Sequence, residues 1–397
     1  MSRRRTRTAA TEAAPRKRTR SRAVVSNKKS FTELDNLMGQ VAGRMGEHVM
    51  KKGNVIHGFN CVETGIFMLD FGLLGGIPEG LVSQLYGWEG CGKTTAAMRA
   101  AARAQAKHPD KAVIFIDAEH TFAPDWARSH GIDVDRLYVV QPESGEQAVD
   151  ILDAVLRADD TAMVILDSLP ALVPQKEIDS SAEDSLVARR SQLIGRACSK
   201  ILSSTQAARA KGNNPTTIFI NQFRMKIGVV HGDPRTLPGG NQPKYLATTM
   251  VELKKKKEHM GKDEYDMPIV SHNEHAFAIK KSKVGNSLRE GEFVMVCDPN
   301  NPLGQGAMDE GRQVVTYAKR MGLVGGGGQS WWVDGIDEKF GKMAEIVDYL
   351  YQDDYEYSML RARIVAERRK AVGLPAVPPD GYLMGMTIDE LAERMEV

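Results

Sequence analysis

The most specific chemical motif in the chain is GWEGCGKT, at residues 87–94. Its spacing, G-x-x-x-x-G-K-[ST], is typical of a P-loop, in which backbone N–H groups surround a phosphate chain. Glycines permit the necessary backbone conformations, and a helix that begins at Lys93 adds the positive end of its dipole. Lys93 is expected to reach the β- and γ-phosphates. We therefore expect a nucleotide to be bound by Gly87, Trp88, Glu89, Gly90, Cys91, Gly92, Lys93, Thr94 and Thr95.

Two carboxylates further along the chain could complete such a site. Asp167 ends the apolar run TAMVILD and fits a Walker B acid, so we expect Thr94 and Asp167 to hold Mg²⁺, largely through water. Glu119 follows the run AVIFID, and a carboxylate there can deprotonate an attacking water, which makes it the candidate base. The alternatives are a helix-capping role for Asp167 and a structural salt bridge for Glu119.

The elements that must position these groups are visible as four apolar runs. LVSQLY ends in the P-loop, AVIFID in Asp117, TAMVILD in Asp167, and TIFIN in Asn221, which Gln222 follows. From residue 81 onward such runs alternate with helical stretches, which predicts βαβ units and a parallel sheet. The carboxyl ends of parallel strands meet at one edge, so these polar groups should converge on a single crevice.

The segment after Gln222 suggests what the nucleotide controls. An amide at that edge can detect the γ-phosphate and pass the signal into FRMKIGVVHGDPRTLPGGN. This segment mixes Arg224, Lys226 and Arg235 with Gly239 and Gly240, without a regular apolar period. Such a composition favours a flexible loop that grips nucleic-acid phosphates.

Composition limits the class of protein. The 397 residues are 42% hydrophobic and 26% charged, and no apolar run approaches the roughly 18 residues of a membrane helix, so we expect no membrane partner. Four scattered cysteines without a C-x-x-C pair favour reduced thiols in a cytosolic compartment. Residues 1–29 hold 11 Lys or Arg against one acid, which predicts a disordered tail that contacts nucleic acid. A tail without a specific role and an organellar transit peptide are the alternatives.

Both ends of the ordered chain have their own pattern. Residues 31–45 predict an amphipathic helix, because Leu34, Leu37, Met38, Val41 and Met45 recur at helical spacing. From about residue 303, a helical stretch, the strand-like SWWVDG and further helix predict a small separate domain. Its tryptophans are better explained as the core of that domain than as a platform for stacked bases.

In this order, GWEGCGKT, FIDAEH (115–120), QPESGEQA (141–148), VILDSLPAL (164–172), FINQFRMKIG (219–228) and PGGN (238–241) resemble the RecA family of DNA strand-exchange recombinases, in its bacterial and phage branch. The resemblance runs from about residue 30 to 350. It implies an α/β fold with a RecA-type P-loop ATPase core, whose mostly parallel sheet is flanked by helices. The expected parts are a basic tail (1–29), an N-terminal helical polymerisation segment (30–60), the core (61–302) and a small C-terminal α/β domain (303–397).

The resemblance also implies an activity. The protein would use ATP and Mg²⁺ to form a helical filament on single-stranded DNA and pair it with homologous duplex DNA, in the cytoplasm of a bacterium or a phage-infected host. Single-strand-binding and loader proteins would be further partners. Glu119 would be the catalytic glutamate and Gln222 the switch between ATP and DNA. Lys281 and Lys283 would reach the ATP of the neighbouring subunit, so hydrolysis would require assembly, and Trp126 would stack on adenine.

DNA contacts follow from the same resemblance. Residues 223–241 would form the second DNA-binding loop, and the first loop, 174–190, is shorter than usual, so that only Arg189 corresponds clearly. The residues implied in DNA binding are Arg189, Arg224, Met225, Lys226, Ile227, Gly228, Arg235, Gly239, Gly240 and Asn241.

Some features depart from the family pattern. Ala123 stands where a polar adenine contact is common, the C-terminus lacks a strongly acidic tail, and the basic N-terminal extension lies outside the pattern. Two other classes of function stay open on the same core. One is a ring-shaped helicase, against which INQFRMKIG argues, and the other is a non-catalytic protein that coats or regulates DNA.

Overall fold

The computed structural model describes residues 32–45, 60–179, 187–226, 232–285 and 289–374. The chain divides into two units, residues 1–51 and 52–397. In the first, the predicted amphipathic helix is confirmed as α1 (Thr32–Met45), on which Leu34, Leu37 and Met38 are exposed. The basic tail predicted for residues 1–29 lies outside the described residues.

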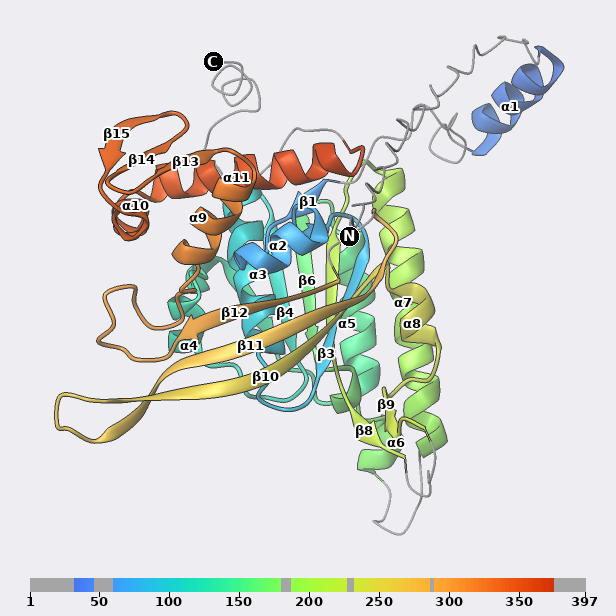
Figure 1. Ribbon diagram of the computed structural model, residues 1–397. Coiled ribbons are helices and arrows are strands. Elements are labelled where there is room, and N and C mark those ends of the chain that lie inside the picture. Colours follow the sequence, from blue (N-terminus) through green and yellow to red (C-terminus); the bar gives the residue numbers. More distant parts are fainter. Residues whose placement is uncertain (1–31, 46–59, 180–186, 227–231, 286–288, 375–397) are drawn as a thin grey trace, which may run out of the picture. The chain divides into compact units, whose positions relative to one another are not determined.

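The second unit is built on an eight-stranded sheet in the order β12-β11-β10-β3-β7-β6-β4-β5 (Figure 1). All neighbours from β10 to β5 are parallel, and the pairs β10–β11 and β11–β12 are antiparallel. The predicted mostly parallel α/β sheet is therefore confirmed. The strands are β3 (Val82–Gly87), β4 (Ala112–Asp117), β5 (Leu137–Val140), β6 (Thr161–Asp167), β7 (Thr216–Gln222), β10 (Thr249–Lys262), β11 (Pro268–Ser282) and β12 (Glu290–Val296).

Helices cover both faces of this sheet, because buried strand residues alternate between two hydrophobic cores. On β4, Val113 and Phe115 join the core that contains α2 (Phe67–Leu73) and α3 (Lys93–Lys107). Ile114 and Ile116 point the other way, into the core formed with α5 (Gly145–Arg157) and α7 (Val187–Ala210). The alternation fixes the strand register and thus which residues reach the edge.

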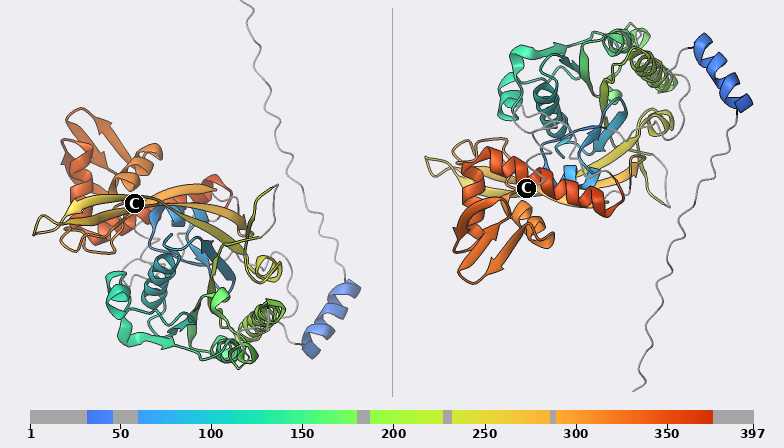
Figure 2. Two further views of the ribbon diagram at one scale, coloured as in Figure 1. Left: turned by 90° about the horizontal axis from the view of Figure 1, so that it is seen from below. Right: turned by 90° about the horizontal axis from the view of Figure 1, so that it is seen from above.

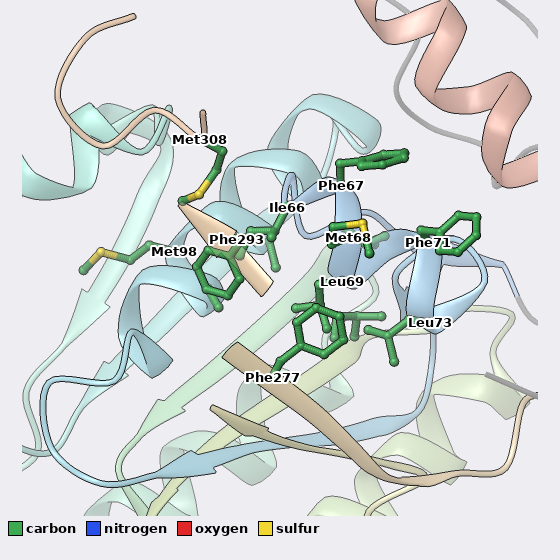
Figure 3. Close-up of a cluster of buried hydrophobic side chains, with 14 of the residues drawn as sticks. Ile66, Phe67, Met68, Leu69, Phe71, Leu73, Met98, Phe277, Phe293 and Met308 are labelled. Carbon is green, nitrogen blue, oxygen red and sulfur yellow. The ribbon is translucent and has the colours of Figure 1, made fainter. Parts of the chain in front are cut away.

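The core on the α2 and α3 side is the more extensive one. Figure 3 shows Leu69 of α2 beside Phe277 of β11, and Phe293 of β12 between α2 and Met98 of α3. These four side chains and Phe67 of α2 are all buried. In the sequence, β1 (Cys61–Val62) precedes α2 and β2 (Ile77–Pro78) follows it. The two strands pair in a small antiparallel sheet.

The C-terminal elements extend the same core. The ring of Tyr317 on α9 lies 4.8 Å from that of Phe71 on α2, and α11 also contacts α2 (Figure 2). The predicted helix, strand and further helix after residue 303 are all present, with the strands in a three-stranded antiparallel sheet. The elements are α9 (Gly311–Arg320), β13 (Val324–Gly327), β14 (Ser330–Val333), β15 (Ile336–Phe340), α10 (Met343–Gln352) and α11 (Asp354–Ala371).

The β10–β11 hairpin is a feature that the sequence patterns did not predict. Its strands have 14 and 15 residues, and the hairpin projects beyond the helices in Figures 1 and 2. Register shifts at three points along the pair mark bulges. The remaining short elements are α4 (Pro124–Ser129), α6 (Gln175–Ile178), β8 (Arg224–Met225), β9 (Arg235–Thr236) and α8 (Gln242–Leu246). Across the described ranges, no helix is long and apolar enough to span a membrane.

Candidate active site and nucleic-acid interface

The ends of four neighbouring strands bring the predicted site residues together. In the register of the sheet, Gly87 of β3 is opposite Gln222 of β7, and Asp117 of β4 is opposite Asp167 of β6. Because β7 and β6 are adjacent, the P-loop, Gln222, Asp167 and the turn that carries Glu119 share one edge. This is the carboxyl edge at which ligands bind in open parallel sheets.

The backbone of the P-loop has the shape of a phosphate cradle. Gly90 and Gly92 have φ angles of 66° and 87°, in the left-handed region that favours glycine. At Gly87 an added Cβ would lie 2.2 Å from the carbonyl oxygen of Leu253, so the strand leaves no room for a side chain. Helix α3 begins at Lys93, immediately after this turn. These features fit the nucleotide predicted for the motif.

The side chain of Lys93 folds back onto the backbone of the P-loop. Its ammonium group donates a hydrogen bond to the Trp88 carbonyl oxygen at 2.7 Å and lies 3.7 Å from Cys91 Sγ. Both Lys93 and Cys91 are buried, and burial raises the pKa of the Cys91 thiol. The Cys91 side chain is thus a small neutral group that fills buried space within the P-loop.

Thr94 and Asp167 form a pair suited to magnesium. Thr94 Oγ1 donates to Asp167 Oδ2 at 2.6 Å. Burial raises the pKa of Asp167 to about 6, the bond from Thr94 opposes this shift, and the nearby Glu119 adds to it. A bound cation would relieve this cost by favouring the carboxylate. No cluster of three or more His, Cys, Asp or Glu suited to a metal occurs in the described part of the chain, and Mg²⁺ commonly takes one or two protein carboxylates together with phosphate oxygens.

Glu119 sits at the centre of a small hydrogen-bond network. Its Oε1 accepts a bond from Ser168 Oγ at 2.5 Å and one from Gln222 Nε2 at 3.3 Å. Asp117, two residues earlier, is buried and accepts from the Phe122 N–H and from Gln141 Nε2, each at 2.9 Å. The network joins the candidate base to the strand that leads into the predicted DNA loop. Ser168 was not assigned a role from the sequence, although its place after Asp167 puts it at the same edge.

Lys281 and Lys283 lie away from the P-loop of their own chain. Lys281 pairs with Met250, which pairs with Gln84, and the Lys283 N–H donates to the Thr248 carbonyl oxygen at 3.2 Å. Both lysines are therefore at the amino end of β3 and β10, whereas the P-loop follows the carboxyl end of β3. Lys281 Nζ donates to the Lys244 carbonyl oxygen, and desolvation together with the charge of Lys283 lowers its pKa.

Trp126, expected to stack on adenine, is half-buried on α4. Its ring meets the His130 ring edge-on, with 4.5 Å between centroids. Ala123 is exposed just before the helix begins.

The described residues of the predicted DNA loop include a short antiparallel ribbon. Arg224 and Met225 of β8 pair with Thr236 and Arg235 of β9, and the Lys226 N–H donates to the Pro234 carbonyl oxygen at 2.9 Å. Arg224, Met225 and Lys226 are exposed. Ile227 and Gly228 lie outside the described residues. In the ribbon, backbone groups of β8 and β9 serve as each other's hydrogen-bond partners.

Arg235 differs from the other basic residues of the loop. It forms a bidentate ion pair with Asp233 and contacts the buried carboxylate of Glu252 at 3.2 Å. Its hydrogen bonds lower the pKa of Asp233 to about 2. Arg235 therefore serves at least to hold β9 against β10.

A groove of about 1370 Å³ runs along α7 and joins the two predicted DNA regions. Arg189 from the first region and Gly239 from the second both line it, beside Gln242, which follows Gly240 and the exposed Asn241. It is also lined by Arg196 and Lys200, which sequence reasoning missed. The signal was available, since Arg189, Arg196 and Lys200 recur at seven- and four-residue spacing on one helix face.

A P-loop at the carboxyl edge of a mostly parallel sheet, with acidic side chains on adjacent strand ends, defines a P-loop nucleotide-binding protein. The sequence matches the family described as the RecA N-terminal domain over residues 32–299. The chain therefore belongs to the RecA family, and it is a RecA-type recombinase.

Individual relatives agree with this assignment. Protein RecA of Dichelobacter nodosus is 35% identical over 319 residues, which cover 80% of this chain and 84% of that protein. Protein RecA of Francisella philomiragia is 36% identical over 267 residues, or 66% of this chain and 71% of that protein. Protein RecA of Francisella tularensis subsp. novicida has the same identity over the same length and the same two coverages.

Proposed function

We propose that this protein hydrolyses ATP when it is assembled on single-stranded DNA, and that it uses the nucleotide cycle to pair that strand with a homologous duplex. The observation that carries the proposal is the position of Glu119, whose carboxylate accepts hydrogen bonds from Ser168 and Gln222. Gln222 ends β7, and the predicted DNA loop begins at the next residue. A single hydrogen bond, from Gln222 to Glu119, therefore connects the candidate base to the residue just before the loop.

We propose the following roles for the nucleotide-site residues, which the geometry of the strand ends supports. The P-loop N–H groups and Lys93 would hold the phosphates, and Trp126 would contribute to the base site. Thr94 and Asp167 would hold Mg²⁺, which neutralises charge on the phosphate oxygens when it is bound. Glu119 would orient a water and accept its proton as the water oxygen bonds to the γ-phosphorus and the bond to the ADP oxygen breaks. Ser168 and Gln222 would fix the carboxylate for this step.

We infer that DNA lies along the α7 groove and the β8–β9 ribbon. Arg189, Arg196 and Lys200 would neutralise backbone phosphates, and Gly239 and Gly240 let the DNA backbone approach the chain closely. Arg224, Met225 and Lys226 would add contacts from the ribbon. Contacts of this type position a strand without reading its sequence, as homologous pairing requires.

Assembly would complete the catalytic site. Lys281 and Lys283 are at the sheet edge opposite to their own P-loop, so we propose that they serve the nucleotide of the next subunit in a helical filament. A head-to-tail contact of this kind generates an open helical filament when its rotation does not bring the subunits back into a closed ring. We propose a cytoplasmic location, with single-strand-binding and loader proteins as partners.

The test is the ATP hydrolysis rate of the protein alone, with single-stranded DNA and with duplex DNA, using Lys93→Ala as the blank. We expect strong stimulation by single strands, and we expect Gln222→Ala to lose that stimulation while it still binds a non-hydrolysable ATP analogue. Equal loss of analogue binding and stimulation would contradict the switch role of Gln222. No stimulation of the unmodified protein would favour a coating or regulatory protein, and ring particles that unwind duplexes would favour a helicase.

A further inference from the structure

An aromatic contact joins the P-loop directly to the DNA loop. The ring centroid of Trp88, the second residue of the P-loop, lies 5.4 Å from that of Phe223, with 50° between the ring planes. Phe223 immediately follows Gln222, and its N–H donates to the Gly87 carbonyl oxygen at 3.3 Å. Tyr86 meets the same ring edge-on at 5.5 Å. The residues on either side of Gly87 thus both hold Phe223.

The contact continues into the second strand of the DNA ribbon. The guanidinium carbon of Arg235 lies 4.9 Å from the centroid of the Phe223 ring. Arg235 is part of β9 and is fixed by Asp233 and Glu252. A continuous path of side chains therefore leads from Trp88 through Phe223 to β9.

Trp88 is well placed to report the state of the phosphate site. Its carbonyl oxygen accepts the hydrogen bond from Lys93, the residue expected to bind the phosphates. Trp88 is 45% exposed as a whole residue, so the contact with Phe223 can rearrange without opening the buried core. A shift of the P-loop backbone at Trp88 would therefore move the ring that Phe223 packs against.

We propose that Trp88 and Phe223 are positioning residues that couple nucleotide binding to DNA binding, as a second connection besides Gln222. The two connections differ in what they contact. Gln222 touches the candidate base Glu119, whereas the aromatic pair touches the P-loop backbone and the β8–β9 ribbon. This inference rests on the proposed function, because it concerns the same two ligands.

Coupling between two binding sites is reciprocal, which gives a sharp test. Two ratios are measured with a non-hydrolysable ATP analogue and an oligothymidylate: the gain in DNA affinity on adding analogue, and the gain in analogue affinity on adding DNA. We expect Phe223→Ala to lower both ratios by the same factor, about fivefold. Trp88→Ala should lower them similarly, and the double variant should lower them no further, because either change breaks the one contact.

Conservative and matched variants separate coupling from simple damage. Phe223→Tyr and Trp88→Phe keep an aromatic pair and should restore both ratios. Trp332→Ala removes a similarly exposed tryptophan from β14 and should leave both ratios unchanged. A purely structural contact would change stability without changing the ratios.

Other outcomes would overturn the proposal. Unchanged ratios in Phe223→Ala, or factors that multiply in the double variant, would show that the pair does not couple the sites. If the unmodified protein shows no gain in either ratio, the proposed function itself fails. If it shows the gain and Phe223→Ala retains it, only the present inference fails.

Discussion

At the scale of single residues, the site depends on how one carboxylate is held. Glu119 is exposed at the sheet edge, yet its Oε1 is fixed by the hydroxyl of Ser168, which follows β6, and by the amide of Gln222, which ends β7. Two donors on one oxygen leave the other free to accept a proton from water. Such positioning is what a general base needs, since reach and alignment come before pKa in importance.

Glu119→Gln tests this role, because the amide keeps the size of the side chain but cannot accept the proton. We expect hydrolysis in the presence of single-stranded DNA to fall at least about 100-fold, in line with the usual contribution of a general base. Binding of a non-hydrolysable ATP analogue should persist, as measured by equilibrium titration. Glu338→Gln, on the exposed surface of β15, is the matched control. A rate within a few-fold of the unmodified protein would exclude Glu119 as the base.

At the scale of elements, the sequence patterns predicted the strands and helices of the core but made no prediction of the strand order. The strand before the P-loop, the helix after it, and the strands that end in Asp117, Asp167 and Gln222 are all present. Local apolar periodicity is enough for these, since each pattern lies within one segment. The strand order cannot be predicted in this way, because it depends on packing between segments that are distant in the sequence. For example, β3 lies between β7 and β10 and not beside β4, the next strand of the sheet in the chain.

The same reason explains what was missed at the site. The bonds from Ser168 and Gln222 to Glu119 join residues 49 and 103 positions apart. The ion pair of Arg235 with Glu252 gives a basic loop residue a structural contact that its sequence context did not indicate. A motif gives the residue types at an edge, but the partner of each side chain depends on strand register.

The contact between the end of α4 and the turn before α9 contains a buried histidine, His130, which should make the stability of the folded protein depend on pH. His130, at the end of α4, is buried against the loop at Gly306, and burial lowers its pKa to about 4, with the charge of Arg99 adding to the effect. The unfolded chain, with an ordinary histidine pKa near 6.5, binds more protons than the folded chain between these values. Stability contributed by the neutral ring is therefore complete above about pH 6.5 and declines as the pH falls toward 4.

We expect His130→Phe, which cannot titrate, to lose about 2 kcal/mol less stability than the unmodified protein between pH 7.5 and pH 5. Thermal unfolding midpoints at the two pH values measure the difference. His120→Asn is the control, because His120 is exposed and its φ of 57° suits asparagine. Parallel losses in His130→Phe and the unmodified protein would show that His130 does not cause the pH dependence.

At the scale of the whole molecule, the opposite placement of the P-loop and the lysine pair makes a strong prediction for mixtures. The double variant Lys281→Ala/Lys283→Ala and the variant Lys93→Ala should each hydrolyse ATP weakly. Mixed in equal amounts on single-stranded DNA, they should recover activity, because some contacts join an intact P-loop to intact lysines of the neighbour. Random mixing gives roughly a quarter of the contacts this composition in a head-to-tail assembly. No recovery, with mixed filaments visible by electron microscopy, would mean that the lysines act within their own subunit.

The separation of Lys281 and Lys283 from their own P-loop also makes the two ends of an assembly unequal. If these lysines complete the nucleotide site of the next subunit, as we propose, every nucleotide in a row of subunits would be completed by a neighbour except at one terminus, where the P-loop would face solvent. The opposite terminus would offer lysines that no nucleotide meets. Hydrolysis would therefore be absent at one tip and present everywhere else. The two ends of the filament would then differ in nucleotide state as well as in the surface they expose. A short filament would turn over less ATP per subunit than a long one, and growth and loss of subunits would occur at chemically different ends.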